Sequence, residues 1–196
     1  AGLFTLLLLS FSPLHIKFSQ IIRSDMMACA FMLCVLLAAH RAMNSAKPEI
    51  RTYAPAAAWV GLAVTTKWPF IASGLAGVGA ILSQCRDDVL PWRHGARIFF
   101  ALGLMSVAMI LCVSPYLLLD YPTVMSNLAG EARTYHLGAT GGGALWNFNW
   151  YVTGPIWYAL GPAGVLLACI GVATSFHTKA TRFILLPVLF GFAVVL

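Results

Sequence analysis

Charged side chains are scarce in this sequence, and their scarcity excludes the usual soluble classes of protein. Only 9% of the 196 residues are charged, whereas 60% are hydrophobic. Soluble domains carry about a quarter charged residues, so this composition is typical of an integral membrane protein. The formal net charge of +6 does not indicate a nucleic-acid partner, because the basic residues fall between apolar runs.

Motifs for nucleotide binding and for hydrolytic catalysis are also lacking. The sequence has no Walker-type loop, no dinucleotide-binding glycine pattern, no H-E-x-x-H and no nucleophile elbow. The run Gly141 to Gly143 is not followed by the lysine and helix that a phosphate cradle requires. The cysteines show no C-x-x-C spacing and are interpreted as packing residues. We therefore expect no bound nucleotide.

Long apolar runs, by contrast, are abundant. A membrane-spanning helix needs ~20 apolar residues. Gly161 and Pro162 interrupt one run, which predicts a short turn before the span itself. The first and last runs meet the ends of the sequence, so we expect a fragment of a longer chain with about seven membrane segments. The clear runs are Met26 to Met43, Ile98 to Leu119 and Pro155 to Ser175, with truncated runs at Ala1 to Ser10 and Phe183 to Leu196.

The thirty residues from Ala54 to Ser83 are too long for one crossing. As a single helix they would extend ~45 Å, whereas a bilayer core is ~30 Å thick. Pro69 disfavours a continuous helix, and Lys67 is costly in the middle of a bilayer. The sequence predicts two short helices joined at Lys67.

The distribution of basic residues favours the same topology. With two helices, eight basic residues lie on one side of the membrane and three on the other, with Lys67 left uncounted; with one helix the split is seven to four. The positive-inside rule prefers the first arrangement. The eight are Arg41, Lys47, Arg51, Arg86, Arg93, Arg97, Lys179 and Arg182, and the three are Lys17, Arg23 and Arg133.

A long loop, residues 120–151, is the main interruption of the apolar pattern, and it falls on the side with few basic residues. Its first part has helical spacing of apolar residues, with Pro122 near the start and Gly138 at the expected stop. Its end is rich in aromatics, from Trp146 to Tyr151. This order predicts an amphipathic helix on the membrane surface, followed by an aromatic belt.

Polar groups near membrane edges are the first candidates for a site. Asp25, after Ser24, either complements a helix dipole or accepts a sugar hydroxyl. Arg23 either reaches lipid headgroups or grips a phosphate with its planar guanidinium. Lys67 either anchors the turn at the interface or binds an anion such as a lipid-linked phosphate.

The long loop adds further polar candidates. Asp120, Glu131 and Tyr135 are candidates for binding the sugar or the acceptor, and Glu131 and Tyr135 share a helical face. A lone histidine such as His136 more often ends a helix than binds a metal. A metal site there would need two further ligands.

Three segments in order resemble integral-membrane glycosyltransferases of the GT-C type. The resemblance is to the bacterial relatives of dolichyl-phosphate-mannose–protein mannosyltransferase and of the lipid A aminoarabinose transferase. It covers roughly residues 3–171, a partial transmembrane domain. The segments are SPLHIKFSQIIRSDMMACAFMLCVLLAAHRA, GLAVTTKWPF and SPYLLLDYPTVMSNLAGEARTYHLG.

The resemblance implies a plasma-membrane enzyme that transfers a sugar from a polyprenyl-phosphate donor to a lipid, glycan or protein acceptor on the extracytoplasmic face. It implies that Arg23 and Lys67 contact the donor phosphate, and that His136 lies where some relatives place a divalent-metal ligand. The general base of such enzymes follows the first span, and the sequence starts beyond that point. We therefore expect no catalytic base in this fragment.

Two other classes also agree with this composition. A secondary transporter or permease has broken helices, but its ionisable groups lie deep in the spans. An inactive membrane scaffold is the other class, and it would make the polar groups of the loop dispensable. The sequence upstream of Ala1 would separate these hypotheses.

Overall fold

The described part of the chain, residues 24–131, 146, 149–150 and 152–195, is built from helices without any strand. In this computed structural model, four helices are long and apolar enough to cross a membrane. These helices confirm the predicted all-α architecture and support a membrane location. The four are residues Ser24–Met43, Trp68–Arg86, Trp92–Val113 and Thr153–Ser175.

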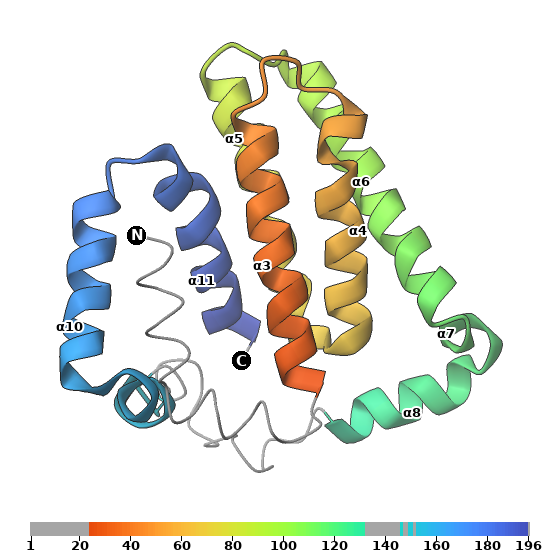
Figure 1. Ribbon diagram of the computed structural model, residues 1–196. Helices are drawn as coiled ribbons and strands as arrows, with labels where there is room; N and C mark the ends of the chain where they lie inside the picture. Colours follow the sequence, from red (N-terminus) through yellow and green to blue (C-terminus); the bar gives the residue numbers. More distant parts are fainter. Residues whose placement is uncertain (1–23, 132–145, 147–148, 151, 196) are drawn as a thin grey trace.

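The first half of the described chain forms an antiparallel bundle in which α3 packs against α4 and α5, and α4 against α6 (Figure 1). Consecutive spans reverse direction, with η1 and α5 forming one span together, so the connections alternate between two ends. The end that holds the α3–α4 and α5–α6 connections is named the basic end, and the opposite end is named the Lys67 end. The segments are α3 (Ser24–Met43), α4 (Ile50–Thr66), the 3-10 helix η1 (Trp68–Gly74), α5 (Leu75–Arg86) and α6 (Trp92–Val113).

The predicted break at Lys67 is confirmed. The α4 helix ends at Thr66, Lys67 has an extended backbone (φ −159°, ψ 121°), and η1 begins at Trp68. Pro69 has no N–H to bond to the carbonyl of Thr65, so the helix cannot continue. It fits the first turn of η1 instead, where an N–H has no helical partner. The run from Ala54 to Ser83 therefore folds as two antiparallel segments.

The apolar run predicted at Ile98 to Leu119 is displaced from its predicted position. We expected a span from Ile98 to Leu119, whereas α6 runs from Trp92 to Val113. Pro115 explains the early end, because it lacks the N–H that would bond to the carbonyl of Leu111. Residues Tyr116–Leu119 form a separate short helix, α7, and Tyr121–Glu131 form α8. The predicted loop helix exists to Glu131, and its continuation to Gly138 lies outside the described residues.

The last helices contain the predicted interruption. The α10 helix (Trp157–Ser175) follows a π-helix, η2 (Val152–Ile156), and is kinked at Gly161, which has φ 65° and ψ 172°. Only glycine adopts this conformation without strain. After α10, the π-helix η3 (Thr181–Leu185) leads into α11 (Leu186–Val195). The α11 helix packs on η1 and α5, whereas α10 has no buried residue and packs on η2.

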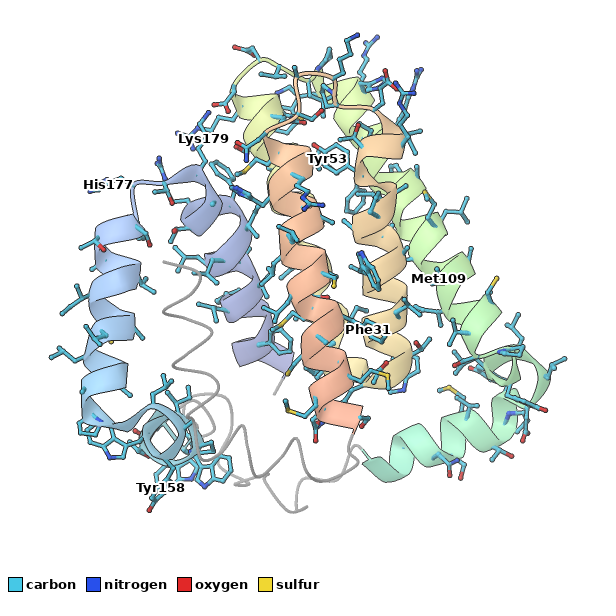
Figure 2. The ribbon with its side chains drawn as sticks, viewed as in Figure 1. Phe31, Tyr53, Met109, Tyr158, His177 and Lys179 are labelled. Carbon is cyan, nitrogen blue, oxygen red and sulfur yellow. The ribbon has the colours of Figure 1, made fainter. Side chains whose placement is uncertain are left out.

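The core lies mainly between α3, α4, α5 and α6. It contains small residues at close crossings and a few large side chains, such as Tyr53 and Ile98. Phe31 of α3 stacks on Trp59 of α4 with ring centroids 5.8 Å apart, and Met109 of α6 lies against Gly61 of α4 (Figure 2). A Cβ at Gly61 would lie 2.6 Å from the Cβ of Met109. This glycine therefore allows α4 and α6 to approach closely.

Candidate functional site

The charged side chains of the described helices are divided unequally between the two ends. The basic end carries eight basic residues at helix ends and connections, and its acids are Glu49, Asp87 and Asp88. Lys179 and His177 lie near this end, and Tyr158 lies at the Lys67 end (Figure 2). The eight basic residues are those predicted to share one side: Arg41, Lys47, Arg51, Arg86, Arg93, Arg97, Lys179 and Arg182.

Lys67 is held in place by the backbone of the turn. Its N–H donates to the carbonyl of Ala63 at 2.9 Å, and its own carbonyl accepts from the N–H of Phe70 at 3.1 Å. The residue thus closes α4 and opens η1 at once. Because both backbone groups are bonded, the extended conformation of Lys67 is fixed, and its side chain leaves the bundle at a defined point.

The ammonium of Lys67 forms an ion pair with the carboxylate of Asp25, at the start of α3. The two residues lie 42 positions apart in the sequence. Their side chains are 44% and 31% exposed, so both remain accessible from solvent. Two of the predicted site residues, Lys67 and Asp25, are therefore brought together at one end of the bundle.

An apolar cluster underlies this ion pair. Ala28 and Ala63 are fully buried and Phe70 nearly so, and Phe192 of α11 packs edge-on against Phe70 with ring centroids 5.2 Å apart. Ala28 is one turn from Asp25, and Ala63 is one turn before Lys67. The charges therefore lie next to an apolar cluster, where an ammonium interacts more strongly with an anion than it does in bulk water.

Asp120 lies apart from this pair. It follows α7, where its N–H donates to the carbonyl of Tyr116 at 2.9 Å and its carbonyl accepts from the N–H of Val124 at 3.1 Å. Its side chain is exposed, and no hydrogen bond or ion pair joins it to Lys67. The α7 and α8 helices lie at the Lys67 end (Figure 1). Asp120 is therefore at the same end of the bundle as the ion pair of Lys67 and Asp25 but does not take part in it.

The remaining predicted site residues belong to the part of the chain that is not described. Arg23, Tyr135 and His136 lie outside the described residues, and so does the side chain of Glu131 at the end of α8. Within the described ranges, no group of three or more histidine, cysteine or carboxylate side chains is placed to hold a metal ion.

Exposed aromatics accompany the polar groups at the Lys67 end. Trp68 is next to Lys67, Tyr116 begins α7, and Tyr121 begins α8. Trp157 and Tyr158 begin α10 (Figure 2). Tryptophan and tyrosine at one level of a bundle are typical of a membrane–water interface. The aromatic belt predicted from the sequence, Trp146 to Tyr151, consists of other residues, of which Trp146 and Trp150 are described and exposed.

A buried polar cluster near the basic end was not predicted. The amide nitrogen of Gln84 lies 3.0–3.1 Å from the carbonyls of Ala42, Met43 and Ser45, and its amide oxygen accepts from the Tyr53 hydroxyl at 2.5 Å. Gln84 is 2% exposed and Tyr53 is fully buried. The cluster ties α3, α4 and α5 together. Gln84 lies close to Ser83, Arg86 and Asp87 in the sequence, so its neighbours gave no signal of a buried amide.

Comparison with protein-family models, with curated proteins and with solved structures finds no match to this chain.

Proposed function

We propose that the chain is part of a membrane glycosyltransferase of the GT-C type, with about seven membrane segments within residues 1–196. In this proposal it moves a sugar from a polyprenyl-phosphate donor to an acceptor on the extracytoplasmic side of the plasma membrane. The observation that carries the proposal is the ion pair between Lys67 and Asp25 next to this apolar cluster. This end has few basic residues, as an extracytoplasmic side should.

The chemistry of such a transfer needs a cation where this lysine lies. When the bond between sugar and donor breaks, negative charge develops on the departing lipid phosphate, and a fixed cation stabilises it. Lys67 supplies this charge in the proposal, together with Arg23. Asp25 pairs with the ammonium while the donor is absent. When the donor phosphate takes that place, the carboxylate accepts a hydrogen bond from a hydroxyl of the sugar. No residue of this chain is assigned as the general base in this proposal.

The loop after α6 completes the proposed site. The α8 helix lies on the membrane surface in this proposal, and Asp120, Glu131 and Tyr135 contact the sugar or the acceptor. His136 is the proposed ligand of a divalent metal, if the enzyme uses one. Support comes from the position of α7 and α8 at the Lys67 end (Figure 1) and from the exposed aromatics beside them.

Secondary transport is the second candidate, and a specific observation favours it. The chain has a broken segment at Lys67, a kink at Gly161 and a π-helix before α11, and discontinuous helices are a feature of transporters. The ionisable groups of transporters lie near the middle of the membrane, whereas Lys67 and Asp25 lie at an end. Their position supports transfer at a surface over transport through the bundle.

The test is a transfer assay on the full-length protein in native membranes. Polyprenyl phosphates that carry mannose, glucose or aminoarabinose serve as donors, and glycosylated product is measured. Lys67→Ala and Arg23→Ala should each abolish transfer. Lys179→Ala is the matched control, because it breaks a comparable ion pair, with Asp87 at 2.5 Å, at the opposite end. Undiminished transfer by Lys67→Ala and Arg23→Ala would remove both residues from the site.

A further inference from the structure

One face of α6 carries arginines near the basic end and large apolar side chains below them. Positions 93, 97, 100, 104 and 107 are separated by four, three, four and three residues, which places them within about 40° of one line along a helix. The residues on this line are Arg93, Arg97, Phe100, Leu104 and Val107. We refer to these five residues as the α6 stripe.

The stripe faces away from the bundle. Gly95, Ile98 and Leu102, on the opposite side of α6, are buried against α4 and α5. Phe100 and Leu104 are by contrast 72% and 73% exposed, and Val107 is half-exposed. Phe100 is braced by Phe99, with ring centroids 5.5 Å apart in an edge-on arrangement. No described element of the chain covers the stripe.

The two arginines of the stripe lack acidic partners in the part of the chain that the structure describes. Arg93 and Arg97 are both exposed, and neither guanidinium group takes part in a hydrogen bond or ion pair there. Two other cations of the basic end are paired, Arg51 with Glu49 at 2.8 Å and Lys179 with Asp87 at 2.5 Å. Arg93 and Arg97 are one turn apart, so both guanidinium groups can reach one phosphodiester.

We propose that the α6 stripe binds an anionic membrane phospholipid. The phosphodiester lies between Arg93 and Arg97, and one acyl chain follows Phe100, Leu104 and Val107 toward the middle of the bilayer. Charge complementarity selects an anionic headgroup, because two unpaired guanidinium groups at the headgroup level attract net negative charge. The apolar residues directly below them select a lipid over a soluble phosphate, which would leave that surface uncovered.

This site is separate from the proposed donor site. It lies on α6 toward the basic end, whereas Lys67 and Asp25 lie at the other end of the bundle (Figure 1). Lipid binding to the stripe therefore does not depend on the glycosyltransferase proposal. Either can fail while the other holds.

The experiment measures lipid binding to the full-length protein by native mass spectrometry. The purified protein, in a neutral detergent, is titrated with phosphatidylglycerol and with phosphatidylcholine. The wild type should retain phosphatidylglycerol more strongly. Arg93→Gln/Arg97→Gln should lower that affinity roughly thirtyfold, at about one kilocalorie per mole for each basic residue. Arg41→Gln/Arg51→Gln, the matched control, should change it about twofold or less, because charges off this face act only through a screened field.

Three outcomes would overturn the proposal. Equal retention of both lipids by the wild type would remove the preference for an anionic headgroup. Equal loss in both double variants would show that net charge acts without a site. A photoreactive amino acid at Leu104 tests the occupant directly: a lipid adduct supports the proposal, and an adduct with another polypeptide shows that a protein covers the stripe.

Discussion

Gly79 of α5 lies directly against the backbone carbonyl of Phe183 in η3. A Cβ built on Gly79 would lie 1.4 Å from that carbonyl oxygen. In an α-helical pattern this carbonyl would bond to the N–H of the residue four positions on, which is Pro187 and has none. The close approach of α5 and η3 therefore requires glycine at position 79, because any side chain there would overlap the carbonyl of Phe183.

We expect Gly79→Ala to destabilise the protein by about 3 kcal/mol, near the upper range for overpacking, because only backbone movement can relieve the overlap. Gly103→Ala in α6 is the control, since nothing lies within 4 Å of a Cβ there. It should be neutral or slightly stabilising, by ~1 kcal/mol or less, because alanine favours helix over glycine. Thermal unfolding of both variants in detergent measures the difference. An equal effect of the two substitutions would contradict the close contact.

The hydrogen bond between Tyr53 and Gln84 supports a second prediction. Tyr53→Phe keeps the ring but leaves the buried amide oxygen of Gln84 without its donor. We expect a loss of about 1–3 kcal/mol in the free energy of unfolding. Tyr158→Phe removes a hydroxyl from a side chain that is 78% exposed and should change little. Chemical unfolding followed by circular dichroism checks both. An unchanged free energy of unfolding in Tyr53→Phe would mean that this bond contributes nothing to stability.

The break at Lys67 was predictable because two constraints act on the sequence locally. Pro69 lacks a donor, and a helix from Ala54 to Ser83 is longer than a bilayer is thick. The end of α6 was equally predictable from Pro115. The span was placed too far along the chain, to Leu119, because only the apolar residues were counted. Such features need no knowledge of distant parts of the chain.

The buried cluster around Gln84 was not predictable in this way. Its partner Tyr53 is 31 residues away, and the carbonyl of Ala42 is 42 residues away. Nothing near Gln84 in the sequence tells it apart from a glutamine at a membrane edge. The pairing of Lys67 with Asp25 was not predicted either, because the sequence offered each only as a separate candidate. The antiparallel packing of α3 and α4 brings the two side chains together.

A charge exchange at this ion pair separates a structural role from an anion-binding role. The side chains of Lys67 and Asp25 are partly exposed, so the pair should contribute only ~0.2–1 kcal/mol to stability. We expect Lys67→Asp/Asp25→Lys to unfold close to the wild-type temperature but to lose sugar transfer, because the cation no longer projects from the turn. Lys179→Asp/Asp87→Lys, the same exchange at the basic end, should preserve both. Full transfer by the first variant would show that only the pairing matters.

The double crossing of residues 54–83 predicts which connections share a side of the membrane. On a background with the five cysteines replaced by alanine, single cysteines are placed at Ser45, Trp68 and Asp88 and labelled in sealed vesicles with a maleimide that cannot cross the membrane. Ser45→Cys and Asp88→Cys should react from one side and Trp68→Cys from the other, because α4 and the η1–α5 segment each cross once. Positive charge near the first two positions places them in the cytoplasm. Labelling of all three from one side would mean that neither segment spans the bilayer, and Lys67 would then have no separate compartment to face.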